Sequence, residues 1–290
     1  MKKLLALLLS AASLLCVGAA AAGCDDGNTI YVQTNAFFAP FEYYDNGKIV
    51  GVDVEIMNKV GEKLGKKVVF QDGDFGAIIQ LVHEGRTADA GAAGITITDE
   101  RKELVDFSIP YYTAVQYVIW DPTVTTDIEV SKNTDDEDVV LWSELRGKVI
   151  GVQNDTTGDI YVNLEINAEG DDYDPEYTGQ LQGSGASCNP YENAQMAVEA
   201  MYGGGTDSQR PACVVVDEMP ATYLTNNMKD RELMCAPLYY TESQATEEEY
   251  AICVTPGNTE LLNAINEVLE EMLKNGEINK LVSQHLGLGE

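Results

Sequence analysis

The feature that most constrains the fold of this chain is the alternation of short β-rich runs with helical stretches. In the first half, residues 30–34, 68–70 and 88–93 have the composition of strands. The two stretches between them carry apolar side chains at helical spacing, and the first, residues 53–64, is expected to have Asp53 as its N-cap. A βαβαβ order of this kind predicts a parallel sheet covered by helices.

A second series of the same kind starts near residue 148. We expect strands at residues 148–152, 179–182 and 212–217, with helices at residues 159–164 and 192–201. Two such units imply two α/β lobes with a cleft between them. Ligands of open α/β sheets bind outside the carboxyl ends of the strands, so the residues that follow the strands are the candidates for ligand contacts.

Three segments complete the chain. Residues 117–120 form an extended apolar piece between the two series, and residues 123–137 form an acidic, Thr-rich stretch expected to be a surface loop. The tail, residues 260–284, has apolar residues along one face and is expected to be helical.

The N-terminus has the form of an export signal. Lys2 and Lys3 precede a long apolar run, residues 4–22, and small residues lead directly to Cys24. We predict a lipoprotein signal peptide at residues 1–23 and lipidation of Cys24. Two alternatives are a retained transmembrane helix, which needs about 20 apolar residues, and plain signal cleavage. After export, either disulfides or free thiols are possible for the remaining cysteines: Cys188, Cys213, Cys235 and Cys253.

Charge and residue usage exclude several classes of function. The chain has 48 Asp plus Glu against 18 Lys plus Arg, a balance that repels phosphate backbones, so we expect no nucleic-acid partner. The only histidines, His83 and His285, belong to no Cys/His cluster, so we expect no metal site. The sequence contains no G-x-S-x-G, P-loop or zinc-protease motif, so we expect no catalytic residues and no cofactor.

The segment 94–101 contains the first candidate ligand contact. A small-residue strand ends at Gly94, and Thr98 is a natural N-cap for the helix that follows. Arg101 falls in the first turn of that helix, where a cation opposes the helix dipole, and this suggests an anionic partner. A guanidinium can bind a carboxylate through two parallel hydrogen bonds. The alternative is a salt bridge to a nearby acid, namely Asp99, Glu100 or Asp106.

Two further candidates follow strands of the second series. Residues 153–159 lie between a strand end and a helix start, where exposed N–H groups bind anions. We expect Thr156 and Thr157 to bind ligand there, and ordinary helix capping is the alternative. Asp217 ends a strongly apolar strand and can neutralise an ammonium group at the cleft mouth. Its alternative role is to cap the helix that Pro220 begins.

Aromatic residues form a fourth group of candidates. Phe37, Phe38 and Phe41 surround Pro40, and Phe75 follows the second expected strand. Such side chains either pack in the core or form apolar walls for a ligand.

Several motifs resemble those of one protein family. They read NAFFAPFEY, IVGVDV, GITITDER, VDFSIPYY, LRGKVIGV and VVVD, at residues 35–43, 49–54, 94–101, 105–112, 145–152 and 214–217. In this order they resemble the bacterial extracellular solute-binding protein family 3, which includes glutamine-, histidine- and lysine/arginine/ornithine-binding proteins. The resemblance runs from about residue 29 to residue 288.

The resemblance implies an α/β, two-lobed periplasmic-binding-protein fold (type II, or Venus flytrap), each lobe a mainly parallel sheet covered by helices. Lobe 1 would comprise residues 24–116 and 250–290, and lobe 2 residues 117–249. Hinge strands would lie near residues 114–120 and 245–254.

The resemblance also implies how the backbone groups of an amino acid would be held. Arg101 would clamp the α-carboxylate, helped by the N–H groups of Thr96 and Thr157. Asp217, the Gly94 carbonyl and the Thr96 hydroxyl would bind the α-ammonium.

The ligand side chain would meet a different set of residues. Phe38 and Phe75 would sandwich it, and Asn35 would reach its polar end. Relatives for basic amino acids often carry Asp where Asn35 stands, which argues against a cationic side chain. Gln153 and Asn154 stand where some relatives carry a ligand-reaching residue, so the specificity is open.

The expected function is therefore binding of a small amino acid outside the cytoplasmic membrane and its delivery to an ABC permease. The protein would act as a lipid-anchored monomer, by lobe closure without chemistry. One alternative is an exported dehydratase of the cyclohexadienyl or arogenate type on the same fold, with Asp155, Asp159 or Asp217 as a general acid. Another is a ligand sensor.

Overall fold

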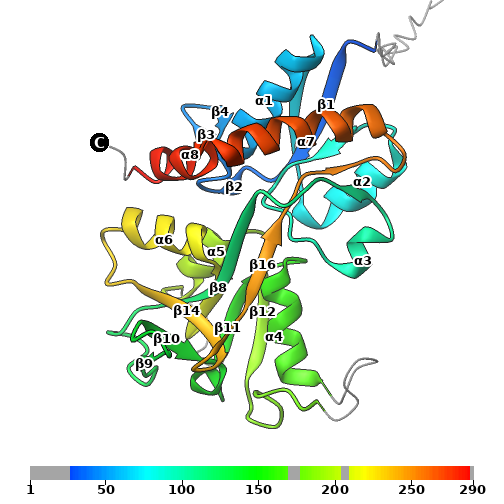
Figure 1. Cartoon of the computed structure of the whole chain (residues 1–290). Coiled ribbons are helices and arrows are strands. Elements are labelled where there is room, and N and C mark those ends of the chain that lie inside the picture. Colours follow the sequence, from blue (N-terminus) through cyan, green and yellow to red (C-terminus); the bar gives the residue numbers. More distant parts are fainter. Residues whose placement is uncertain (1–26, 169–176, 204–208, 288–290) are drawn as a thin grey trace, which may run out of the picture.

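The chain folds into two α/β lobes stacked on each other, as seen in a computed structural model that describes residues 27–168, 177–203 and 209–287 (Figure 1). Lobe 1 contains a five-stranded sheet in the order β5-β1-β6-β17-β7. Lobe 2 contains a nine-stranded sheet whose main path is β12-β11-β13-β8-β14-β10-β9. The predicted two-lobed α/β fold is thereby confirmed, but both sheets are mixed rather than mainly parallel, because antiparallel strands such as β17 in lobe 1 and β8 in lobe 2 adjoin the parallel strands. The predicted signal peptide and Cys24 lie outside the described residues.

Lobe 1 is built around the first predicted βαβαβ unit. Its sheet strands are β1 Thr29–Thr34, β5 Lys67–Asp72, β6 Ala90–Gly91, β7 Asp106–Phe107 and β17 Cys253–Val254. Strands β5, β1 and β6 are parallel, and β17 runs antiparallel to β6. A small antiparallel sheet precedes α1 and contains β2 Phe37–Phe38, β3 Glu42–Asp45 and β4 Lys48–Val50.

The helices of lobe 1 come from both ends of the chain. They are α1 Val52–Leu64, η1 Phe75–Ala77, α2 Ile78–Glu84, α3 Asp99–Lys102, α7 Thr259–Lys274 and α8 Glu277–His285. The C-terminal helices α7 and α8 pack against α1 (Figure 1). The tail, expected to be one helical stretch, is thus divided into two helices, because Gly276 takes a left-handed φ of 74° between them.

Lobe 2 repeats the arrangement with additional strands. Its strands are β8 Tyr112–Trp120, β9 Ser131–Lys132, β10 Asp138–Leu141, β11 Val149–Gln153, β12 Ser187–Tyr191, β13 Cys213–Asp217, β14 Met234–Thr241, β15 Gln244–Ala245 and β16 Glu247–Tyr250. Its helices are η2 Trp142–Leu145, α4 Thr157–Asn167, α5 Ala194–Ala200 and α6 Glu218–Asn227. Strands β12, β11 and β13 are parallel, and of these the second pattern predicted β11 and β13.

One predicted strand, at residues 179–182, is wrong. The segment forms turns, because its backbone donors are used by Glu165 of α4. The N–H of Gln180 donates to the Glu165 carboxylate at 2.7 Å, and the N–H of Leu181 donates to the Glu165 carbonyl at 3.0 Å. Gly179 is needed for this approach, since a Cβ there would lie 2.2 Å from the same carbonyl oxygen. The strand that pairs with β11 is instead β12.

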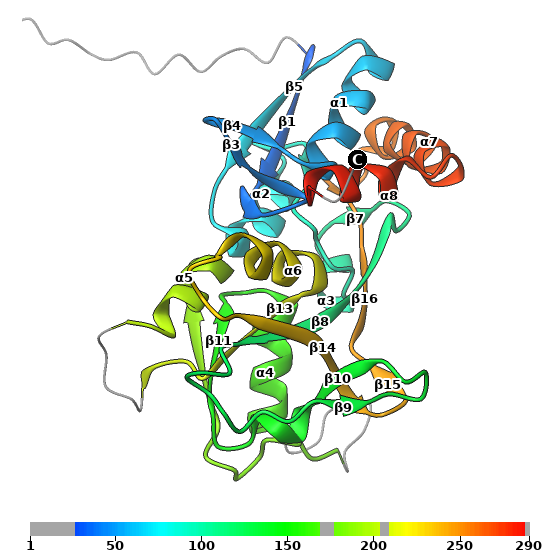
Figure 2. The ribbon, with the colours of Figure 1, turned by 90° about the vertical axis from the view of Figure 1, so that its left-hand side faces the viewer.

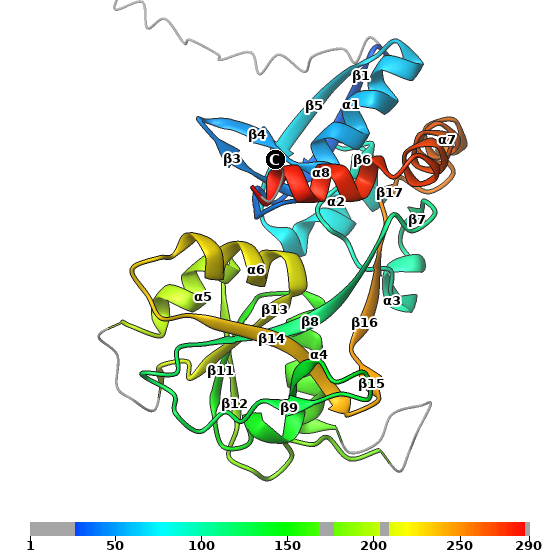
Figure 3. The ribbon, with the colours of Figure 1, turned by 60° about the vertical axis from the view of Figure 1, so that its left-hand side comes forward.

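Two antiparallel strands join the lobes. Strand β16 pairs with the first half of β8, with Glu248 opposite Ala114. Figures 2 and 3 show both strands running from lobe 1 to lobe 2 beside each other. They match the two predicted hinge regions, whereas the lobe boundaries at residues 116/117 and 249/250 stay a prediction.

The cysteines of the described residues are free thiols: Cys188, Cys213, Cys235 and Cys253. Burial raises the pKa of the Cys213 and Cys253 thiols to about 12, so both remain protonated at neutral pH and are poor nucleophiles. Within the described ranges, no helix is long and apolar enough to span a membrane.

Candidate ligand-binding site between the lobes

One cavity between the lobes gathers the residues singled out from the sequence. All the expected ligand-binding residues except Arg101 line it, together with Ala93 and Gln153; they are Asn35, Phe38, Phe75, Gly94, Thr96, Thr156, Thr157 and Asp217. The cavity measures about 10 Å³, which is room for roughly one water. An amino acid can therefore enter only if the lobes part.

Arg101 reaches from lobe 1 across the cleft. Thr98 caps α3 by accepting a hydrogen bond from the Arg101 N–H at 3.2 Å, as predicted. The guanidinium donates to the Thr96 carbonyl at 2.8 Å and to the Asp155 carbonyl of lobe 2 at 3.3 Å. It also lies 5.5 Å from the centre of the Phe75 ring, in a cation–π arrangement.

The alternative role of Arg101 as a surface salt bridge is wrong. Within the described part of the chain it forms no ion pair with Asp99, Glu100 or Asp106, and Asp99 pairs with Lys102 at 3.0 Å. Burial lowers the pKa of Arg101, and the charge of Glu248 is the largest of several effects that oppose this shift, Asp217 being another. A half-buried guanidinium that carbonyls hold in place, without a direct carboxylate partner, suits a bound carboxylate.

Asp217 lies at the end of β13, in the N-cap position of α6, but its side chain makes no capping bond. The capping alternative is therefore wrong, and the helix begins at Glu218 rather than Pro220. The carboxylate turns into the cleft, where it accepts a hydrogen bond from the Gln116 side-chain amide. Burial, then the charge of Glu248, raises the pKa of Asp217 well above its usual range, whereas Arg101 lowers it.

The N-terminus of α4 contributes two threonines with different roles. Thr156 is the N-cap and accepts from the Asp159 N–H at 3.4 Å, so the capping alternative holds for this residue. Thr157 is the first helical residue, and its hydroxyl donates to Glu248 at 2.8 Å. A Cβ on Gly158 would lie 2.9 Å from the Gln116 amide oxygen, so glycine permits the close approach of this helix to β8.

Gly94 is held in its place by Asp53. Gly94 has a left-handed φ of 54°, and a Cβ there would lie 2.6 Å from the Phe38 ring, so only glycine fits. Its N–H donates to Asp53 at 2.9 Å, and the Tyr111 hydroxyl donates to the same carboxylate at 2.6 Å. The expectation that Asp53 caps α1 is wrong: Gly51 occupies the N-cap position, and Asp53 points away to brace the site.

The buried Asp53 makes unfolding depend on pH. Burial raises its pKa to about 6, although the bonds from Tyr111 and Gly94 oppose the shift. Because this folded-state pKa lies above the unfolded one, the folded protein binds more protons between about pH 4 and pH 6. We expect the contribution of Asp53 to the free energy of unfolding to fall by about 2–3 kcal/mol over that window as the pH rises.

Denaturant titrations of the wild type and of Asp53→Asn at several pH values test this expectation. The wild type should lose stability from pH 4 to pH 6.5, and the variant should lose clearly less. Equal slopes for the two proteins would show that Asp53 is not the group that titrates.

Two amides connect the lobes at the other end of the cavity. The Asn35 amide nitrogen donates to the Gly73 carbonyl at 2.8 Å, and its oxygen accepts from the Gln153 amide at 3.1 Å. The Gln153 side-chain oxygen is buried and makes no hydrogen bond within the described residues. This end can therefore accept a hydrogen bond from a ligand side chain.

Sequence reasoning missed two residues of the site, Gln116 of β8 and Glu248 of β16. Both are buried, with exposed fractions of 1% and 3%. The run of three glutamates, 247–249, gave a usable signal. Alternation along a strand places Glu248 on the opposite face from its neighbours and on the same face as Tyr250.

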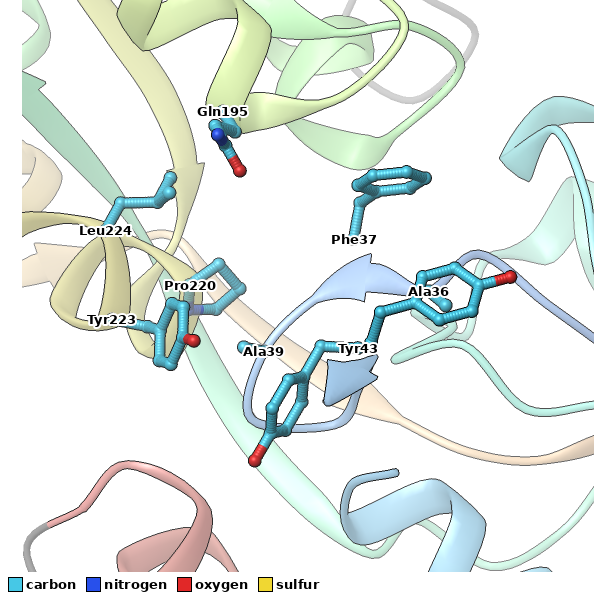
Figure 4. A pocket seen from close by; sticks show the side chains of 9 residues that line it. Ala36, Phe37, Ala39, Tyr43, Gln195, Pro220, Tyr223 and Leu224 are labelled. Carbon is cyan, nitrogen blue, oxygen red and sulfur yellow. The ribbon is translucent and has the colours of Figure 1, made fainter. Parts of the chain in front are cut away.

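Two of the larger hollows outside this cavity share Phe37 as a lining residue. One, of about 200 Å³, has walls from both lobes: Figure 4 shows Phe37 and Tyr43 facing Gln195, Pro220 and Tyr223. The Tyr43 and Tyr223 rings lie 5.8 Å apart, so the lobes touch at this rim. The other, of about 500 Å³, shares Asn35 with the inner cavity, and its charged lining residues are all acidic: Asp72, Asp74 and Glu192.

Comparison with known proteins places the chain in a family. The model of the bacterial extracellular solute-binding proteins, family 3, matches residues 30–288. The chain belongs to this family. As a family 3 protein it shares 30% identity with the arginine-binding extracellular protein ArtP of Bacillus subtilis (strain 168), over 97% of this chain and 96% of ArtP. A probable histidine-binding protein of Neisseria gonorrhoeae is 29% identical, over 98% of this chain and 96% of that protein.

The fold of this family 3 protein also matches solved structures. The substrate-binding protein of an amino acid ABC transporter superposes with a TM-score of 0.68 at 28% identity, and the match covers 89% of this chain and 98% of the other. The type II two-lobed fold is thus confirmed.

Proposed function

We propose that this protein binds a small amino acid outside the cytoplasmic membrane and delivers it to an ABC permease. The observation that carries the proposal is the arrangement of opposite charges in the interlobe cleft. Arg101 and Asp217 come from different lobes and face the cleft, with Thr96 and Thr157 near them. A guanidinium and a carboxylate so placed match the two charged α-groups of an amino acid. The amino-acid-binding relatives support this reading.

Closure of the lobes is the proposed mechanism, and it requires no covalent chemistry. Several contacts cross from lobe 1 to lobe 2, among them Arg101 to Asp155 and Gln153 to Asn35. A ligand that adds contacts to both lobes favours the closed state by its differential affinity for that state. The permease would then meet the closed form. We propose that the protein acts as a monomer, held at the membrane by a lipid on Cys24.

Calorimetric titration with the twenty amino acids and cystine tests the function. We expect a micromolar or tighter response to at least one of them. Absence of any response, with the protein shown to be folded, would contradict amino-acid binding. Chromatography of the mixture after incubation checks that the ligand is returned unchanged.

The same panel tests a prediction about ligand charge. The outer hollow beside Asn35 carries Asp72, Asp74 and Glu192 and no basic residue in its lining. Carboxylates around the site repel an anionic side chain, so aspartate and glutamate should bind at least about tenfold more weakly than their amides. The comparison of glutamate with glutamine at equal ionic strength is the direct measurement. A preference for glutamate would contradict the prediction.

A further inference from the structure

Glu248 lies on a strand that connects the lobes, directly behind the ligand cavity. It belongs to β16, is 3% exposed, and is not among the residues that line the cavity. Its side chain nevertheless contacts residues of both lobes. One carboxylate oxygen accepts from the Thr96 hydroxyl of lobe 1 at 2.6 Å and from the Thr157 hydroxyl of lobe 2 at 2.8 Å.

The other carboxylate oxygen connects Glu248 to the ammonium-binding end of the site. It accepts from the Gln116 side-chain amide at 2.8 Å, and the same amide nitrogen donates to Asp217. Glu248 therefore joins four surrounding side chains in one buried network, directly through Thr96, Thr157 and Gln116, and through Gln116 to Asp217.

The chemistry of a carboxylate fixes the direction of these bonds. Burial raises the pKa of Glu248, whereas the hydrogen bonds from Thr96, Thr157 and Gln116 and the charge of Arg101 oppose this shift and favour the ionised carboxylate. An ionised carboxylate only accepts hydrogen bonds, and a hydroxyl has a single proton to donate. Thr96 and Thr157 both line the cavity, and each gives its proton to Glu248. Their hydroxyl oxygens therefore present only lone pairs to the cavity. Lone pairs favour a ligand group that donates hydrogen bonds, such as an α-ammonium.

We infer that Glu248 is a positioning residue, which orients the Thr96 and Thr157 hydroxyls as acceptors toward the ligand and joins the two lobes when they close. The inference rests on the proposed function, because it concerns how the same site selects its ligand. Glu248 stands on a strand that pairs with β8, and its two threonine bonds reach Thr96 of lobe 1 and Thr157 of lobe 2. Both bonds are charge-assisted, which makes them stronger than hydrogen bonds between neutral groups.

Glu248→Gln, which keeps the shape and replaces an acceptor by an amide donor, is the first test. Glu249→Gln is the matched control, since Glu249 lies next to it on the same strand with an exposed side chain. The probes are L-arginine, L-histidine and L-glutamine, each beside its analogue without the α-amino group. For the tightest of the three amino acids, Glu248→Gln should weaken binding about tenfold or more, and Glu249→Gln less than about twofold.

The analogues separate positioning from a general loss of structure. If Glu248 sets the hydroxyl polarity, Glu248→Gln should weaken the amino acid about tenfold more than its deaminated analogue. Equal losses for both would overturn the inference. Thermal unfolding of each variant checks folding, and Glu248→Asp, which keeps the charge but is one methylene shorter, provides a second variant if Glu248→Gln fails to fold.

A double variant tests the path through lobe 2. Thr157→Val removes the hydroxyl without changing the shape, so Glu248→Gln/Thr157→Val should bind no more than about threefold worse than Glu248→Gln alone. Additive losses would contradict the proposed connection. If the wild type binds neither the three probes nor any amino acid of the full panel, the proposed function fails. If the wild type binds and Glu248→Gln matches it, only the role of Glu248 fails.

Discussion

Arg101→Ala should weaken amino-acid binding about a hundredfold or more. The guanidinium lies between the Thr96 carbonyl of lobe 1 and the Asp155 carbonyl of lobe 2, stacked over Phe75. Without it, the α-carboxylate would be buried with no cation, next to the carboxylates Asp217 and Glu248. Removing one partner of a buried ion pair costs on the order of 3–5 kcal/mol, because the other charge stays desolvated.

Lys102→Ala is the matched control for Arg101→Ala. Lys102 is the next residue of α3, and its exposed ammonium pairs only with Asp99 at the surface in the described structure. This variant removes the same unit of charge at a residue that does not line the inner cavity, so its affinity should stay within about twofold of the wild type. Calorimetry on both variants gives the comparison. A near-normal affinity for Arg101→Ala would refute the assigned carboxylate site.

Asp217→Asn should also weaken binding about a hundredfold or more, but its effect on stability should differ from that of an ordinary core mutation. The side-chain oxygen of the introduced asparagine can still accept a hydrogen bond from the Gln116 amide nitrogen, so the local packing is retained. The charge that balances an α-ammonium is lost. Because burial and the nearby Glu248 disfavour the ionised Asp217, neutralising it should leave the melting temperature equal or higher.

Glu218→Gln is a control at the adjacent position. Its carboxylate lies at the start of α6, where it accepts from the Tyr117 hydroxyl at 3.4 Å, outside the cavity lining. It should bind like the wild type. A stable, folded Asp217→Asn protein with unchanged affinity would refute the assigned ammonium site, whereas a large fall in melting temperature would show that Asp217 has a structural role as well.

The two charged residues could be found from the sequence because each lies at or shortly after the end of an expected strand. Asp217 ends a buried apolar strand. Arg101 lies in α3, but this helix is a single turn and Arg101 stands in its last turn, so the expected conflict with the helix dipole is not present. Local rules could not choose between ligand binding and a capping or salt-bridge role. That choice depended on which groups the folded chain brings within hydrogen-bond distance, here Gln116 for Asp217 and the Asp155 carbonyl for Arg101.

By itself the sequence determined the two α/β units and the strand-end loops that bear Arg101, Thr157 and Asp217. These follow from local periodicity and from short motifs, which need no long-range partner to be seen. Only the tertiary structure decided that Asp53 braces Gly94 and that Glu248 joins both lobes, because partners 41 and 152 residues apart meet only after the sheets assemble. The segment 179–182 likewise forms turns and not a strand, because the N–H groups of Gln180 and Leu181 donate to Glu165 of α4. The local sequence pattern does not contain this distant partner.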